Sequence, residues 1–231
     1  MFDARLRQTK QRVFAPIVDV VASFPPLALT VIGLVLGLAA AVAAANGVWL
    51  LALILFIANR TIDGLDGEVA RATAEASDEG GYADMVADTI VYAAIPIGAA
   101  AGSEIGHIWP FVAVLVASFY LNTTTWAYLS ALIEKRGRGA NQHATSIVMP
   151  PGLVEGAETV LFYTFMLAFP GWLDWTMGVM AAAVGAGAGL RFARGVRLLR
   201  GSDGVADRAG ARQDSIEQGS VEQGSVERGR P

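Results

Sequence analysis

Long apolar runs without charge constrain this chain more than any other feature of its sequence. Residues 27–45 contain no charged side chain and almost no polar one. A helix needs roughly 20 mostly apolar residues to cross the hydrocarbon core of a bilayer, so this run alone predicts one membrane span. Only 16 % of the 231 residues are charged, whereas soluble globular chains average about 25 %. The sequence therefore predicts an all-α membrane protein.

Five further segments are apolar enough to be spans if a few polar positions are tolerated. They are residues 48–58, which must continue into the polar sequence after Ala58, and residues 82–102, 108–132, 153–169 and 172–190. Lys and Arg precede the first span, follow the sixth, and stand between spans two and three and between spans four and five, while the other connections contain neither. Basic loops stay on the cytoplasmic side. We therefore expect a six-helix transmembrane bundle in the cell membrane with both termini cytoplasmic.

The two ends of the chain differ from the predicted six-span domain at residues 25–200. Residues 1–24 mix basic and apolar side chains, which predicts an amphipathic juxtamembrane helix on the cytoplasmic surface. Residues 201–231 are polar and carry the repeat SIEQG, SVEQG, SVERG, which predicts a disordered cytoplasmic tail. The net charge of −4 argues against nucleic-acid binding. The absence of cysteine excludes disulfides, zinc–thiolate sites and thiol catalysis.

Four aspartates stand in or beside the apolar spans. Asp63 and Asp66 share one helix face, and Asp84 and Asp88 share a face of the next helix. A short turn between these helices makes them antiparallel, so the four carboxylates are expected to converge near the cytoplasmic end of the bundle. Clustered carboxylates repel one another and are costly at membrane depth. Two divalent cations, Mg²⁺ or Mn²⁺, would neutralise them, and such a pair commonly serves phosphoryl transfer.

Residues beside the aspartates suit a phosphate-bearing ligand. Gly67 leaves the helix backbone open to a close approach, and Arg71 offers a fork that can hold a phosphate through two hydrogen bonds. Ser77 supplies a hydroxyl in the turn, and Gly80 permits another close approach. Two other interpretations stay open at this point. The aspartates also suit an ion-coupled transporter with an ion or proton site, and the chain could be an inactive structural subunit.

The same residues resemble the signature of the CDP-alcohol phosphotransferase (phosphatidyltransferase) family, D-x2-D-G-x2-A-R-x8-G-x3-D-x3-D. Every fixed position and spacing of that pattern is met between Asp63 and Asp88. The resemblance implies a membrane enzyme of phospholipid biosynthesis. Such an enzyme transfers a phosphatidyl-type group from a CDP-lipid, either CDP-diacylglycerol or CDP-archaeol, to an alcohol acceptor and releases CMP. The identity of the acceptor stays open.

The resemblance also implies a role for each residue of the pattern. Asp63, Asp66 and Asp84 would bind the two divalent cations, and Asp88 would be both a metal ligand and the general base. Contacts with the CDP part of the donor would come from Gly67, Arg71 and Ser77, with Gly80 at the same substrate site. The family resemblance further implies a homodimer.

Overall fold

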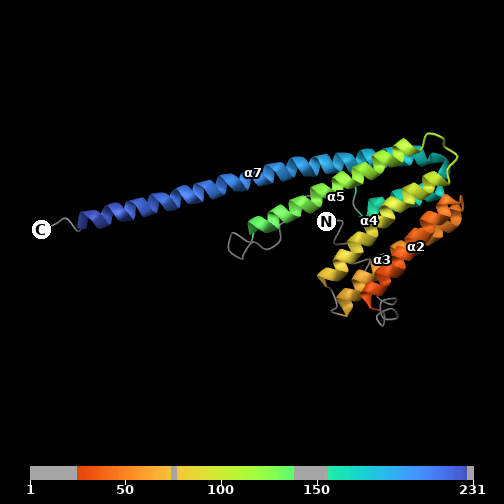
Figure 1. Cartoon of the computed structure of the whole chain (residues 1–231), viewed down its shortest axis with the longest axis horizontal. Coiled ribbons are helices and arrows are strands. Elements are labelled where there is room, and N and C mark those ends of the chain that lie inside the picture. Colours follow the sequence, from red (N-terminus) through yellow and green to blue (C-terminus); the bar gives the residue numbers. More distant parts are fainter. Residues whose placement is uncertain (1–24, 74–76, 138–153, 155, 228–231) are drawn as a thin grey trace. The chain divides into compact units, whose positions relative to one another are not determined.

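The computed structural model describes residues 25–73, 77–137, 154 and 156–227, and every regular element in these ranges is helical (Figure 1). The prediction of an all-α fold is therefore confirmed for this part of the chain. The predicted amphipathic helix at residues 1–24 lies outside the described residues. The elements are α2 (Pro26–Ala45), α3 (Trp49–Ala72), α4 (Asp78–Ala101), α5 (Trp109–Gly137), α6 (Gly156–Ala168), the short 3-10 helix η1 (Pro170–Trp172) and α7 (Leu173–Glu227).

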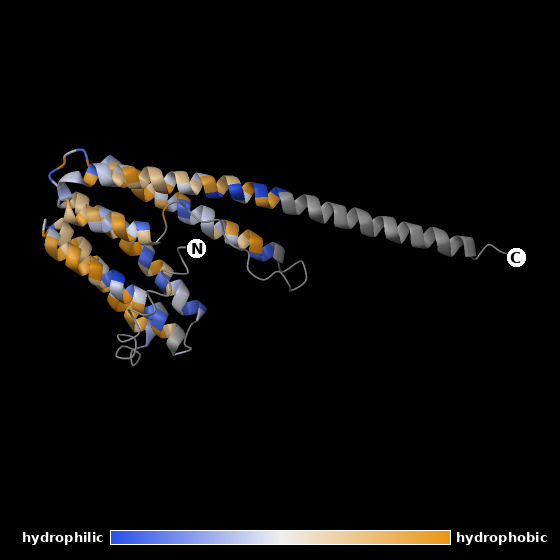
Figure 2. Ribbon diagram, turned by 180° about the vertical axis from the view of Figure 1, so that it is seen from behind, coloured by the Kyte–Doolittle hydropathy of each residue, from blue (hydrophilic) through white to orange (hydrophobic). Residues whose placement is uncertain are grey.

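Within the described ranges, four helical stretches are long and apolar enough to cross a membrane. They are Pro26–Ala45, Asp78–Ala101, Trp109–Lys135 and Pro170–Arg200. Figure 2 shows apolar residues along the helices, interrupted by hydrophilic stretches. The chain is therefore a membrane protein.

Helices α3 and α6 are not among these four stretches. With 24 residues, α3 is about 36 Å long, but its second half carries several charged residues. With 13 residues, α6 reaches only about 20 Å, less than the roughly 30 Å of the hydrocarbon core. The six-span count and the orientation of the termini stay predictions.

Packing divides the chain into two units, residues 1–120 with 153–185 and residues 121–152 with 186–231. In the first unit, α2 packs against α3 and α4, and α6 packs against the same two helices. In the second unit, the buried Arg191 of α7 donates a hydrogen bond to the Asn122 side chain of α5. The structure continues α7 to Glu227, whereas the composition predicts a disordered tail after residue 200. Ala, Arg, Glu and Gln, which recur in this segment, have high intrinsic helix propensity.

Helices α2 and α4 approach each other closely because Gly98 of α4 and Gly102, the C-cap of α4, face alanines of α2. A Cβ atom added to Gly98 would overlap the carbonyl oxygen of Ala41, and one added to Gly102 would overlap that of Ala44. Small residues at a helix interface let two backbones come together inside a membrane. This contact fixes the half of α4 that lies beyond the aspartates.

A proline inside α4 leaves one backbone carbonyl without its usual helical partner. Pro96 has no N–H group, so it cannot donate a hydrogen bond to the carbonyl of Tyr92, four residues earlier. The hydroxyl of Tyr163, on α6, donates a hydrogen bond of 2.6 Å to that carbonyl instead. The Tyr163 side chain is fully buried, and its ring lies edge-on to that of Tyr92, with centroids 5.8 Å apart. A side chain of α6 thus completes the backbone hydrogen bonding of α4.

Candidate active site

The four aspartates of the sequence pattern lie on neighbouring helices of the first unit. Asp63 and Asp66 come from α3, whereas Asp84 and Asp88 come from α4. The carboxylate of Asp63 interacts electrostatically with the other three, and that of Asp84 interacts with Asp66 and Asp88. Asp66 is buried, and the other three are half-buried. The structure therefore brings these carboxylates into one cluster, as the helical spacing predicts.

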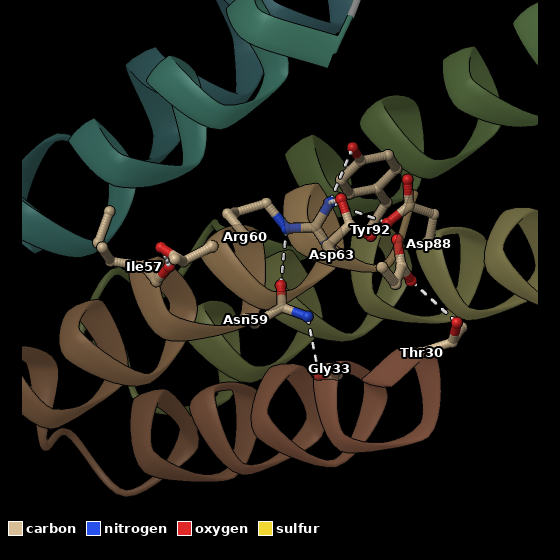
Figure 3. A network of polar contacts seen from close by, with 10 residues as sticks. Thr30, Gly33, Ile57, Asn59, Arg60, Asp63, Asp88 and Tyr92 are labelled. Atoms are coloured by element: carbon tan, nitrogen blue, oxygen red, sulfur yellow. Dashed lines mark hydrogen bonds and ion pairs between the residues drawn. The ribbon is translucent and has the colours of Figure 1, made fainter. Parts of the chain in front are cut away.

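A threonine of α2 forms one wall of this cluster. The hydroxyl of Thr30 donates a hydrogen bond of 2.9 Å to Asp66 Oδ2, and both side chains are buried. Figure 3 shows this bond at the edge of the polar network. A buried carboxylate needs such donors, because removal from water otherwise favours its neutral form. Helix α2 thereby contributes directly to the site.

An arginine lies among the aspartates, where the sequence pattern does not place one. Arg60 Nη1 donates a hydrogen bond of 2.8 Å to Asp88 Oδ1 and lies 3.6 Å from Asp63 Oδ2. Its side chain is only 8 % exposed, so the guanidinium is buried beside these two carboxylates. The same Nη1 atom donates to the hydroxyl oxygen of Tyr92 over 3.1 Å. Figure 3 shows Arg60 between Asp63, Asp88 and Tyr92.

Contacts on its other side hold the Arg60 guanidinium in place. Arg60 Nε donates a hydrogen bond of 2.7 Å to Asn59 Oδ1, and Asn59 Nδ2 donates one of 2.8 Å to the carbonyl of Gly33 on α2. The guanidinium carbon also lies 5.2 Å from the ring centroid of Tyr92 and 5.8 Å from that of Phe56, within cation–π range. Three helices therefore determine where this positive charge lies.

The carboxylates offer the oxygen ligands that Mg²⁺ and Mn²⁺ prefer. Asp84 Oδ1 is buried and, among the described residues, has no hydrogen-bond partner. A buried oxygen in this state favours a cation, because leaving it unsatisfied costs free energy. Within the same described ranges, however, no three acidic or histidine side chains stand in an arrangement that could hold a metal ion. Thr30 and Arg60 engage three of the carboxylates instead. The carboxylate oxygens fit a divalent cation chemically. In this structure the positive charge beside them is that of Arg60.

The predicted donor-binding residues are placed only in part. Ser77 is the N-cap of α4, and its Oγ accepts a hydrogen bond of 3.1 Å from the backbone N–H of Gly80. A Cβ on Gly80 would come within 3.3 Å of that Oγ, so glycine keeps room for the cap. The backbones of Gly67 and Arg71 belong to α3, while the Arg71 side chain lies outside the described residues. Binding of the donor by these four residues stays a prediction.

Sequence reasoning missed Thr30, Arg60 and Tyr92 as members of the site. Two of them carry a local signal, because Arg60 precedes Asp63 by three residues and Tyr92 follows Asp88 by four. These spacings place each side chain on the same helix face as an aspartate. Thr30 has no such signal, since it lies 36 residues before its partner Asp66 on a different helix.

Comparisons with known proteins place the chain in a family. The CDP-alcohol phosphatidyltransferase family matches residues 24–187. Inner membrane protein YnjF of Escherichia coli (strain K12) is 32 % identical over 162 residues, which cover 68 % of this chain and 76 % of that protein.

Two crystal structures of phosphatidylinositol phosphate synthase PgsA1 from Mycobacterium tuberculosis share the fold. The one with CDP-DAG bound has a TM-score of 0.56 at 19 % identity and covers 78 % of this chain and 92 % of its own. The one in complex with manganese and citrate has a TM-score of 0.62 at 18 % identity, with coverages of 78 % and 87 %. On the family match and the E. coli relative together, the chain belongs to the CDP-alcohol phosphatidyltransferase family.

Proposed function

We propose that this protein transfers a phosphatidyl-type group from a CDP-lipid to an alcohol acceptor and releases CMP. The observation that supports this most is the convergence of Asp63, Asp66, Asp84 and Asp88, the aspartates of the family pattern, from two helices into one cluster. Family membership favours this reaction over an ion-coupled transporter that would use the same carboxylates. It also favours an active enzyme over a structural subunit, because every fixed residue of the pattern is present.

The donor in this proposal is a CDP-linked lipid. PgsA1, which shares the fold, has been crystallised with CDP-DAG. In this chain, Gly67, Arg71, Ser77 and Gly80 would contact the CDP part. All four stand in the sequence between Asp66 and Asp84, at the end of α3 and the start of α4. An arginine fork suits the diphosphate, since it donates two parallel hydrogen bonds to a phosphate. The acyl or isoprenoid chains of the donor would remain in the bilayer.

Two divalent cations would be held by Asp63, Asp66, Asp84 and Asp88. A PgsA1 structure contains manganese, and the buried Asp84 Oδ1 is available as a ligand. When bound, such ions supply positive charge that stabilises the diphosphate and the departing CMP. Either Mg²⁺ or Mn²⁺ meets the preference of the oxygen ligands.

Asp88 is the proposed general base. Its carboxylate would take the proton from the acceptor hydroxyl while that oxygen forms a new bond to the lipid-linked phosphorus. The bond from that phosphorus to the CMP oxygen breaks, and CMP leaves with the electron pair. Asp88 is half-buried on α4, where its carboxylate interacts with that of Asp63. A side chain on a packed helix suits a base that must meet a proton at a defined position.

The acceptor is proposed to be a neutral or cationic alcohol. A phosphorylated acceptor would need a cation beside its phosphate, because a buried phosphate without one is strongly disfavoured. The sequence has no Lys directly before Thr145, and the nearby Glu155 and Glu158 disfavour a bound anion. Substitution of the arginines Arg136, Arg138, Arg191 and Arg194 by Gln, one at a time, tests this choice. A large rise of the acceptor KM with an unchanged donor KM would show that the acceptor carries a phosphate.

The deciding experiment measures CMP release by the purified full-length protein in lipid nanodiscs. CDP-diacylglycerol or CDP-archaeol is supplied with Mg²⁺ or Mn²⁺ and with a panel of acceptor alcohols. We expect release with at least one acceptor, and a loss of at least a thousandfold in Asp88→Asn, whose amide cannot accept the proton. Asp174→Asn is the matched control, because Asp174 lies outside the cluster and pairs with His107. Equal activity of wild type and Asp88→Asn would refute the assignment of the base, and no release with any acceptor would refute the reaction.

We also propose that the enzyme works as a homodimer with its site facing the cytoplasm. The basic residues of the connections predict that side. A cytoplasmic site would give direct access to a water-soluble nucleotide product. Cross-linking in intact membranes tests the dimer.

A further inference from the structure

The buried arginine of the cluster is not part of the family pattern read from the sequence, although it contacts two of that pattern's aspartates. Arg60 Nη1 lies 2.8 Å from Asp88 Oδ1 and 3.6 Å from Asp63 Oδ2. Both carboxylates are proposed metal ligands. A guanidinium and a divalent cation therefore need the same oxygens.

The net charge of the four aspartates explains why a resident cation is needed. Four ionised aspartates carry a charge of −4, and Arg60 reduces this to −3. Carboxylates gathered in a half-buried cluster repel one another strongly, because the surrounding dielectric is low. Before any metal arrives, a cation fixed beside two of them lowers that repulsion. After two divalent cations have bound, the same arginine leaves the site with a net charge of +1, which suits an anionic diphosphate.

The contacts of Arg60 divide into two sets that can act separately. Nε is bonded to Asn59, and the guanidinium carbon lies over the rings of Tyr92 and Phe56. Among the described residues, the ion pairs with the carboxylates of Asp63 and Asp88 are made by Nη1. Loss of the bond to Asp88 would therefore leave the guanidinium anchored in the same place. It would still repel an incoming cation at short range.

We propose that Arg60 is the resident counter-cation of the carboxylate cluster and that divalent cations bind in competition with it. It rests on the proposed function, because it takes the carboxylate cluster to be a metal site. Arg60 is a positioning residue here, because it acts through Asp63 and Asp88 and not on the substrates. Its positive charge keeps the metal-free carboxylates together and sets the affinity for the metal. An arginine that competes for the ligands makes metal binding weaker and more readily reversible.

Metal binding without any nucleotide or lipid substrate tests this directly. The full-length protein is purified in detergent, and Mn²⁺ affinity is measured from the electron paramagnetic resonance signal of free Mn²⁺. We expect Arg60→Met to bind Mn²⁺ at least tenfold more tightly than wild type, since the competing charge is gone. Arg60→Lys keeps the charge and should stay within about threefold of wild type. Arg197→Met, which removes an exposed arginine of α7, is the control and should leave the affinity unchanged.

Thermal denaturation of the same proteins gives a second measurement. Without metal, Arg60→Met should unfold at a lower temperature than wild type, because its carboxylates lack compensation. Saturating Mn²⁺ should raise the midpoint of Arg60→Met by more than it raises that of wild type. If Arg60→Met is recovered only when Mn²⁺ is present, chelator competition replaces the direct measurement. Competition is supported if Arg60→Met keeps its Mn²⁺ at a chelator concentration at least tenfold higher than the one that removes Mn²⁺ from wild type.

Other outcomes overturn the proposal. Arg60→Met that binds Mn²⁺ no more tightly than wild type, by either measurement, would show that the arginine does not compete. Wild type that binds no Mn²⁺ would remove the competition altogether. Neither result depends on CMP release, which is assayed separately. A protein that binds Mn²⁺ as expected but releases no CMP would refute the proposed reaction and leave the competition standing.

Discussion

The hydroxyl of Thr30 satisfies a buried carboxylate across a helix interface. It donates to Asp66 Oδ2 over 2.9 Å, and Thr30 and Asp66 are 8 % and 6 % exposed. Thr30→Val keeps the shape and removes the donor. We expect it to lower the free energy of unfolding of the metal-free protein by about 1.5–3 kcal/mol, because a hydrogen bond to a charged group is lost in a buried place. The thermal denaturation midpoint in detergent measures this.

Two variants make the Thr30 prediction specific. Thr30→Ser retains the hydroxyl and should recover most of the stability. Thr61→Val is the matched control, because Thr61 is exposed and its hydroxyl donates to the Ile57 carbonyl of its own helix. Comparable losses in Thr30→Val and Thr61→Val would mean that the bond to Asp66 contributes nothing.

At this scale the sequence predicts part of the site for a definite physical reason. The spacings within Asp63–Asp66 and Asp84–Asp88 are fixed by helix geometry, so shared faces can be predicted from one helix at a time. The partners of Thr30 and Arg60 come from other helices and depend on how those helices pack. Arg60 is one of the basic residues between the second and third predicted spans, where the sequence indicates orientation, whereas the structure buries it beside the aspartates.

Helix α4 depends on α6 for one backbone hydrogen bond. Tyr163→Phe keeps the ring and removes the hydroxyl that donates to the carbonyl of Tyr92. An unpaired carbonyl away from water costs about 1–3 kcal/mol, so the variant should unfold at a lower temperature. In a Pro96→Ala background the new N–H of residue 96 can take over that carbonyl, and Tyr163→Phe should then cost little.

A double-mutant cycle separates this bond from the packing of the two rings. We expect a coupling of about 1 kcal/mol between positions 96 and 163, since membrane side-chain hydrogen bonds rarely exceed that by much. Tyr120→Phe serves as control, because its side chain is exposed. Additive effects of Pro96→Ala and Tyr163→Phe would argue that the hydroxyl does not substitute for the missing N–H.

The close contact of α2 and α4 gives a second prediction for an element. Gly98→Ala places a Cβ against the carbonyl oxygen of Ala41, and such overpacking typically costs about 1–3 kcal/mol. Gly185→Ala in α7 is the matched control, because nothing within 4 Å meets a Cβ there and alanine favours a helix. Thermal denaturation should therefore show a lower midpoint for Gly98→Ala and an unchanged or higher one for Gly185→Ala. Equal midpoints would mean that α2 can move aside.

At the scale of secondary-structure elements, the sequence predicts where helices form better than it predicts which helices cross the membrane. The uncharged run at residues 27–45 coincides with α2, because nothing in it opposes either a helix or a membrane. In α3 the apolar first half continues without a break into the charged second half. Hydropathy alone therefore cannot say how much of that helix lies in the bilayer.

The whole molecule offers a clean test of its orientation, because it contains no cysteine. A cysteine at Gly106, an exposed position between α4 and α5 with open space around it, should react with an impermeant thiol reagent added to intact cells. A cysteine at Gly137, where α5 ends, should react only after the membrane is opened. The charge distribution is the reason, since basic residues stay in the cytoplasm. The opposite labelling would place the aspartates on the external side.

At the same scale the sequence predicts one membrane domain at residues 25–200, and these bounds stay a prediction. Packing groups residues 121–152 and 186–231 into a unit of their own, which composition does not indicate. Continuous helices cross that division, α5 at residue 120 and α7 at residue 185. A boundary inside a helix leaves no mark of glycine, proline or polar residues, which are the signals that sequence reasoning uses.

The bond from Tyr163 to the Tyr92 carbonyl also bears on how the protein is made. The two residues are 71 positions apart, and a ribosome adds about 5–20 residues per second, so α6 follows α4 by roughly 4–14 s. During that interval the nascent α4 carries an open carbonyl at Tyr92, the residue whose hydroxyl accepts from Arg60. The part of the aspartate cluster that α4 provides is thus completed late in translation. A nascent chain stalled before Tyr163 would expose this defect to the insertion and quality-control machinery of the membrane.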